Sequence, residues 1–292
     1  MNLFKKHFFL ILALISFSCS DNINNDIIEK LQGDWIPNSK DAGYFLSFRG
    51  NLISDSENEF ARFYIKDDTI IIPKGWDKFS SKKSFQRVTN KYIWFTHTWK
   101  GKTDLYPYVN ANTNYNETII LEDIEIHFRN DFYFGLNYWA IYLNDSLDCF
   151  LGAFYIRNRG KGRSTVPGEK GTYYSKLTMK EFEFIQRKVR NIDLSNLKET
   201  YGTFESNMMH YDPPVIYLLI HYRLKDSNEI KEVKLRFIDY ENSPTTVAIL
   251  INYLHQLHYF YSFKPATKTH NFKRITSAST PTAKYGWDFE DF

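Results

Sequence analysis

The sequence predicts an α+β protein in which a β-rich N-terminal sandwich or small barrel precedes an antiparallel sheet with two helices on one face. Three observations carry this prediction. Short strand-like segments separated by glycine, asparagine and aspartate turns fill the first half of the chain. In the second half, two strands and a helix are followed by two more strands and a second helix, an order typical of α+β domains. Aromatic residues make up 18% of the chain, and they favour half-buried strands.

Residues 1–18 are expected to form a signal peptide, which is not part of the folded protein. A pair of lysines precedes an apolar run from Phe8 to Phe17, which is too short for the roughly 20 residues that span a membrane. Residues 14–19 resemble a bacterial lipobox, although Ser16 stands where leucine is usual. The resemblance implies cleavage before Cys19 and attachment of acyl chains such as palmitate to it. A plain secretory signal with an incidental cysteine is the alternative.

The residues after Cys19 indicate where the protein is held. Ser20, Asp21 and Asn22 resemble the short signal that sends Bacteroidota lipoproteins to the outer face of the outer membrane. This resemblance implies a surface-exposed lipoprotein of the cell outer membrane; the periplasmic face is the alternative. Several acyl chains hold a protein firmly, because each buried CH₂ contributes about 0.8 kcal/mol. The membrane is therefore an expected partner, and polar residues 19–30 are expected to form a flexible tether.

Composition sets further limits. Removal of 18 residues from 292 leaves 274, enough for one large or two small domains. The formal net charge of +3 falls to +1 without the two leader lysines, so we expect no nucleic-acid partner. Acylation of Cys19 would leave Cys149 without a cysteine partner. Its apolar neighbours predict a buried strand residue, and a reactive thiol is the alternative.

Residues 31–128 are expected to form the β-rich N-terminal domain. A short helical turn leads into Gly33-x-Trp35, and strand-like segments follow. These segments are 44–48, 60–65, 69–73, 91–98 and 117–128. A helical turn before Gly-x-Trp resembles the start of lipocalin-like small barrels. The resemblance implies that Trp35 closes one end of a barrel.

Residues 129–262 are expected to form the α+β domain. Thr178 and Glu181 form a capping box, which predicts the start of the first helix. Its apolar face is Phe182, Ile185, Val189 and Ile192. The strands are 138–143, 150–156, 215–224 and 230–240. Ser243-Pro244 predicts a cap and first turn for the second helix, whose apolar face is Val247, Leu250, Ile251 and Leu254.

The ordered pieces of this second domain resemble an uncharacterised domain common in Bacteroidota lipoproteins. They include the helix start at 177–182, the helix exit Asp193-Leu194, Asp212-Pro213-Pro214 before a strand, and Ser243-Pro244. The resemblance implies a fold and a location but no activity. Residues 263–292 are expected to form a loosely ordered tail.

The densest basic run lies in the glycine-rich loop 157–171. Its glycines allow backbone amides to approach an anion, which the side chains could then hold. The candidate anion- or ligand-binding residues are Arg157, Arg159, Lys161 and Arg163. The loop matches neither a phosphate-loop nor a dinucleotide motif, and a solvated connection between strands is the alternative.

Histidines offer two further candidate groups. His255 and His258 stand three residues apart on the second helix, but no His-Glu-x-x-His motif is present. We expect packed or capping side chains there and no metal ion. His210, His221 and Asp212 could be brought together only by the fold.

The sequence contains no catalytic motif, and no cofactor is expected. Four aromatic residues are interpreted either as a glycan-facing patch or as core: Trp94, Trp99, Tyr106 and Tyr108. The predicted function is a lipid-anchored, non-enzymatic binding or interaction module for a glycan, a small ligand or a protein. A hydrolase acting on envelope material or glycans is the alternative.

Overall fold

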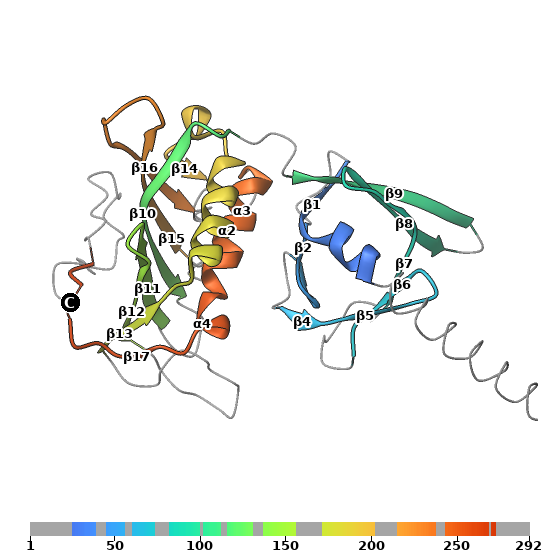
Figure 1. The fold of residues 1–292 in the computed structure, drawn as a ribbon, viewed down its shortest axis with the longest axis horizontal. Helices are drawn as coiled ribbons and strands as arrows, with labels where there is room; N and C mark the ends of the chain where they lie inside the picture. Colours follow the sequence, from blue (N-terminus) through green and yellow to red (C-terminus); the bar gives the residue numbers. More distant parts are fainter. Residues whose placement is uncertain are drawn as a thin grey trace, which may run out of the picture. The chain divides into compact units, whose positions relative to one another are not determined.

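The computed structural model describes residues 25–38, 45–55, 60–73, 82–99, 102–111, 116–130, 137–155, 171–201, 215–237, 243–268 and 270–272 (Figure 1). The chain divides into two compact units between residues 114 and 115. Sheets dominate both units and helices accompany them, so the predicted α+β class is confirmed. Among these residues, no helix has the length and apolar character that crossing a membrane requires.

The first unit contains a nine-stranded antiparallel sheet that nearly closes into a barrel. Its order is β4-β3-β2-β1-β9-β8-β7-β6-β5. The strands are β1 (Gly33–Pro37), β2 (Leu46–Arg49), β3 (Leu52–Asp55), β4 (Ala61–Arg62), β5 (Tyr64–Lys66), β6 (Thr69–Ile71), β7 (Lys82–Val88), β8 (Tyr92–Trp99) and β9 (Lys102–Asn110). Only Phe63 separates β4 from β5, so the two edges of the sheet are consecutive pieces of one chain segment.

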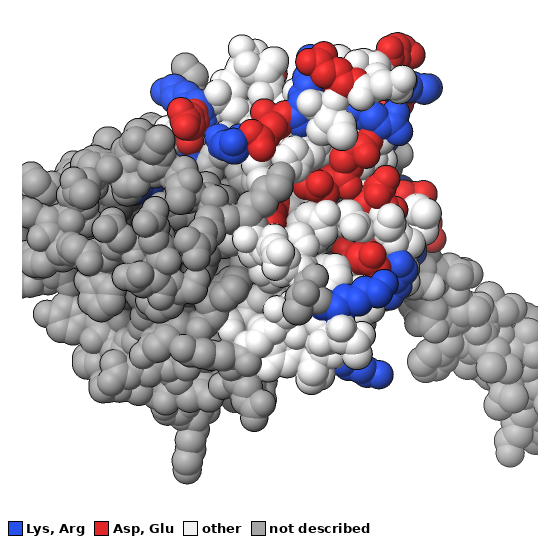
Figure 2. Space-filling model, turned by 90° about the vertical axis from the view of Figure 1, so that its left-hand side faces the viewer, with Lys and Arg blue, Asp and Glu red and all other residues white. Residues whose placement is uncertain are grey.

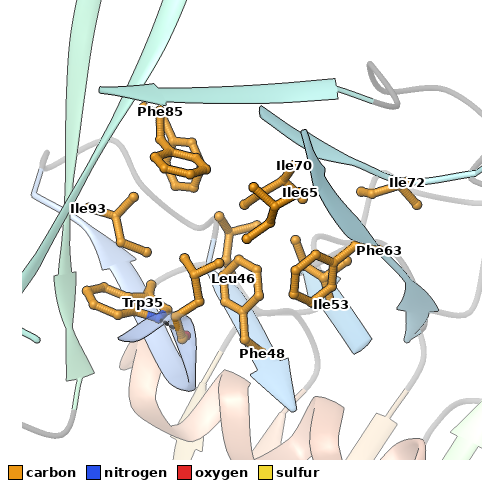
Figure 3. Close-up of a cluster of buried hydrophobic side chains, with 12 residues drawn as sticks. Trp35, Leu46, Phe48, Ile53, Phe63, Ile65, Ile70, Ile72, Phe85 and Ile93 are labelled. Carbon is orange, nitrogen blue, oxygen red and sulfur yellow. Dashed lines mark hydrogen bonds between the residues drawn. The ribbon is translucent and has the colours of Figure 1, made fainter. Parts of the chain in front are cut away.

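Apolar side chains fill the inside of this sheet (Figure 3). Twelve buried residues, each at most 7% exposed, form one cluster: Leu31, Trp35, Leu46, Phe48, Ile53, Phe63, Ile65, Ile70, Ile72, Phe85, Ile93 and Phe95. The indole Nε1 of Trp35 donates a hydrogen bond to the Leu31 carbonyl at 2.6 Å. Strand β1 is thereby tied to the helical segment that precedes it.

The helical segment at 25–31 corrects the prediction of a flexible tether for residues 25–30, whereas residues 19–24 of that prediction lie outside the described residues. Ile27 and Ile28 pack against the core cluster, which gives this helix an apolar face to bury. Gly33, which follows, has a φ of 109°, a conformation that side chains with a Cβ rarely adopt. The glycine of Gly-x-Trp is thus required by the turn from helix to strand.

The second unit is an eight-stranded sheet covered by helices on one face (Figure 1). Its order is β14-β16-β15-β10-β11-β12-β13-β17, and only the β14–β16 pair is parallel. The strands are β10 (Ile119–Asn130), β11 (Asn137–Asn144), β12 (Asp148–Tyr155), β13 (Gly171–Lys176), β14 (Thr200–Tyr201), β15 (Val215–Leu224), β16 (Lys231–Phe237) and β17 (Lys264–Pro265). The helices are α2 (Met179–Arg190), α3 (Thr245–His255) and α4 (Leu257–Phe260).

Strand β10 corrects the predicted domain boundary at residue 128. The sequence analysis placed this strand at the end of the first domain, whereas it pairs with β11 and β15 in the middle of the second sheet. Ile124 and Ile126 are fully buried on one face of it. An alternating apolar strand fits either sheet, and its pairing partners all lie later in the sequence.

The predicted apolar faces of both helices are confirmed. The four residues of the first face are at most 7% exposed, with Ile192 just beyond the end of α2 at Arg190, and on α3 all four are fully buried. Thr178 caps α2 by accepting a hydrogen bond from the Glu181 amide at 3.2 Å. Helix α3 begins at Thr245 with Pro244 at its N-cap, so it starts one residue later than predicted.

The carboxylate of Glu181 links the helical layer together. It is buried at 3% exposure and accepts hydrogen bonds from the hydroxyls of Tyr253 and Tyr261. These residues lie on α3 and just after α4, so the acid of the capping box connects three segments of the layer. A buried carboxylate needs such partners, because burying it without them is costly.

Candidate functional site

The predicted binding and attachment residues lie outside the residues that the structure describes. They are Cys19, Arg157, Arg159, Lys161 and Arg163. His210, Asp212 and the side chain of Trp99 also lie outside them. These assignments therefore stay predictions. Two outer sheet faces, one in each unit, carry the described side chains with functional potential.

The first face is an apolar strip on the outside of β8 and β9, which we call the outer strip. It consists of Tyr92, Trp94, Leu105, Pro107 and Val109. Trp94 lies opposite Pro107, and Tyr92 lies opposite Val109. The intervening residues of β8, Ile93 and Phe95, are buried in the core, so the strip faces away from it.

A bulge in β7 places polar groups beside the indole of Trp94. The register shifts between Phe85 and Arg87, which leaves Gln86 as the extra residue. The guanidinium carbon of Arg87 lies 5.8 Å from the centre of the Trp94 ring. Gln86, Arg87, Trp94 and Leu105 line an open hollow of about 410 Å³. Bulges commonly re-aim side chains in this way.

Of the four aromatic residues suggested by the sequence, the three whose side chains the structure describes do not share one face of the sheet. Trp94 lies on the outer strip, whereas Tyr108 pairs with Ile93 and packs edge-on against Phe95 at 5.2 Å. Burial, together with the charge of Asp55, raises the pKa of Tyr108. Tyr106 shares the face of Tyr108 but is 47% exposed. Core packing thus accounts for Tyr108, whereas the glycan-facing interpretation of Trp94 stays a prediction.

The second face is the outer side of the eight-stranded sheet, where acidic side chains gather (Figure 2). Glu125 on β10 is only 1% exposed, yet it lies on this face. Its two oxygens lie 2.7 Å from His127 Nε2 and 3.3 Å from His270 Nε2. Burial alone would raise the pKa of Glu125, but the hydrogen bonds from the two imidazoles hold it below its usual value.

A third imidazole on this face lies between two carboxylates. His221 Nδ1 is 2.5 Å from Asp123, and its Nε2 is 3.2 Å from Glu232. In a Ser-His-Asp arrangement, the nitrogen turned away from the aspartate meets the nucleophile. Here that nitrogen faces another carboxylate. The geometry is that of a cross-strand hydrogen-bonded cluster and not of an activated nucleophile.

His255 and His258 pack around an indole on the opposite, helix-covered face. Their rings lie 5.2 and 5.6 Å from the Trp139 ring, and that of Phe128 stacks on Trp139 at 4.2 Å. Burial lowers the pKa of each histidine to about 4, so both are neutral at pH 7. Among the described residues, no group of three or more His, Cys, Asp or Glu is placed to hold a metal ion.

Cys149 is a free cysteine in the interior of the second unit. It is fully buried on β12, which confirms the prediction of a buried strand residue. Burial, with a further contribution from Glu181, raises the pKa of its thiol. Because the thiolate is the reactive form of cysteine, the raised pKa makes the thiol of Cys149 unreactive.

Comparison with known proteins identifies no relative from which a function could be inferred, so function is inferred from the two outer faces. No family model, curated protein or solved structure matches the chain. The likenesses to lipocalin-like barrels and to Bacteroidota lipoproteins therefore remain predictions from the sequence.

Proposed function

We propose that this chain is a non-enzymatic binding protein, anchored in the cell envelope by an acylated Cys19, and that its outer strip binds a glycan. The observation that carries the proposal is the outward position of Trp94 on a sheet whose inner face is a filled core. An indole offers a flat apolar surface to a sugar ring. Gln86 lies beside it and the guanidinium of Arg87 lies over its ring, and both are hydrogen-bond donors for sugar hydroxyls.

The strand order supports a lipocalin-like assignment for the first unit. Neighbouring strands are consecutive in the chain except for the β1–β9 pair, and the sheet stays open between its two edges, β4 and β5. This is an up-and-down arrangement, and Trp35 of the Gly-x-Trp motif is buried within it. Because buried side chains fill the inside, we assign the ligand to the outer strip rather than to the lumen.

Replacing Trp94 with alanine is expected to weaken glycan binding about 30-fold, because truncation of a tryptophan hot spot costs about 2 kcal/mol. The measurement is binding of the full chain to a panel of envelope and dietary glycans, followed by titration of the best ligand. Tyr64→Ala is the matched control, since Tyr64 is an aromatic residue 51% exposed on β5, three strands from β8 in the sheet order. Equal losses in both variants, or binding only to proteins, would contradict the proposal.

Replacing Cys19 with alanine is expected to abolish incorporation of a fatty-acid probe into the chain, because that thiol is the proposed attachment atom. Cells expressing the wild-type chain should show the label and lose the protein when intact cells are treated with protease. Label without loss would place the anchored protein on the periplasmic face. A chain without label in the wild type would disprove the anchor.

The alternative of a glycan-directed hydrolase receives less support. Its best candidate residues are Asp123 and His221, and the free nitrogen that such a pair needs is directed at Glu232. The described imidazoles of this face thus lie against carboxylates. We therefore favour binding over catalysis.

A further inference from the structure

The C-terminal segment crosses from one face of the second sheet to the other (Figure 1). After α4 on the helix-covered side, β17 pairs with β13 near the edge of the sheet. The Ala266 amide then donates to the Thr172 carbonyl at 2.9 Å, which continues this pairing by one step. Residues 270–272 follow on the outer face, where they meet side chains of β10, β11 and β12.

His270 has a specific position on that face. Its ring stacks on Tyr142, with 3.9 Å between ring centres and 18° between the planes. Phe150, on the neighbouring strand, lies 5.4 Å away and nearly parallel. The side chain of His270 is only 19% exposed, so a residue of the tail has become part of a packed cluster.

The buried carboxylate of Glu125, which His270 contacts, needs hydrogen-bond donors at this position. Glu125 is bracketed by His127 from its own strand and by His270 from the tail. Without His270, one of its buried oxygens would lose a charge-assisted hydrogen bond. Phe272 adds an edge-on contact to the rings of His127 and His270, at 6.2 and 4.8 Å.

The chemistry of this position selects an imidazole. A ring face is needed to stack on Tyr142, and an N–H donor in the ring plane is needed to reach Glu125. A phenyl ring provides only the face, and a lysine ammonium provides only the donor. An imidazole provides both, which is why we take histidine as the residue that defines the ligand.

We propose that Glu125, His127, Tyr142 and Phe150, here called the imidazole seat, are a binding site for histidine-bearing peptide segments. His270 of the same chain is its resident occupant. A tethered occupant competes with any ligand in trans at an effective concentration in the millimolar range. The site is therefore open to partners only when the tail is displaced or removed.

Removal of the resident side chain provides the test, with free imidazole as the probe. In the full chain, His270→Ala should bind imidazole with a dissociation constant on the order of 1 mM, as expected for a ligand of five heavy atoms. The wild-type chain should bind it at least about tenfold more weakly, since its own tail competes. Asn271→Ala, which changes an exposed neighbour on the tail, should behave like wild type.

Two further variants keep the test decisive. Glu125→Gln in the His270→Ala background should weaken imidazole binding by at least about tenfold. A chain ending at Lys268, which retains β17, should bind the peptide Thr-His-Asn-Phe but not Thr-Ala-Asn-Phe. Circular dichroism checks whether each variant is folded. The proposal is overturned if His270→Ala binds no better than wild type, if Glu125→Gln has no effect, or if both peptides bind alike.

Discussion

Replacing Trp35 with alanine should lower the free energy of unfolding of the first unit by about 3 to 5 kcal/mol. The side chain is fully buried in the core cluster, so its removal leaves a cavity as well as losing apolar contact. The variant also loses the hydrogen bond from the indole to the Leu31 carbonyl. Since whole domains are stable by only about 5 to 15 kcal/mol, this change removes a large share of the total.

Hydrogen exchange resolved by peptide is the measurement that separates the two units. Protection should fall in β1, β2 and β9 while β10 and β15 keep theirs, because the units have separate cores. Trp94→Ala is the matched control, since it removes the same residue type from the outer strip. It should cost no more than about 1 kcal/mol. Equal losses in the two variants would show that Trp35 does not anchor the core.

Acidification from pH 6.5 to pH 4.5 should destabilise the second unit steeply. His255 and His258 have pKa values lowered to about 4 by burial, against an ordinary value of 6.5. Between these values the unfolded chain binds more protons than the folded one, so stability falls as the pH falls. Each histidine contributes up to about 1.4 kcal/mol per pH unit, and the pair up to about 2.7. Above pH 6.5 the effect disappears.

Urea unfolding at several pH values measures this slope, and the double variant His255→Phe, His258→Phe tests its source. Phenyl rings keep the packing around Trp139 but do not titrate, so the slope of the variant should be shallower by about the amount given above. The titration of Glu125 does not affect this comparison of pH slopes. Its lowered pKa means that its contribution is lost only when the pH falls below the ordinary carboxyl range. An unchanged slope in the variant would refute the assignment.

The elements predicted correctly from sequence were those with strong periodicity. Both helix faces repeat apolar residues at helical spacing, and tertiary packing buried all of them. Strands β7 and β9 were missed because neither shows a clear alternation of apolar residues. Phe85 is the one buried side chain of β7, and β9 carries Pro107 and a largely exposed first half. Such strands acquire their place from neighbours in a nearly closed sheet rather than from their own pattern.

The two outer faces differ in how much of each could be predicted from the sequence. The outward position of Trp94 follows from its place between Ile93 and Phe95, once both are known to be core. The imidazole seat offers no comparable local pattern, because Glu125 and His270 are 145 residues apart in the chain. Only the path of the tail around the edge of the sheet brings them together.

The edge strands of the two sheets determine how copies of this chain behave when they are close together. Both edge strands of the eight-stranded sheet, β14 and β17, have only two residues, and β17 contains a proline. In the first unit, Phe63 joins the two edges covalently. Long exposed edges recruit strands from other copies and lead to aggregation, and short or proline-bearing edges prevent it. A protein confined to a membrane surface, as we propose for this chain, meets its own copies often, and the two-residue edge strands β14 and β17 offer these copies little backbone to pair with.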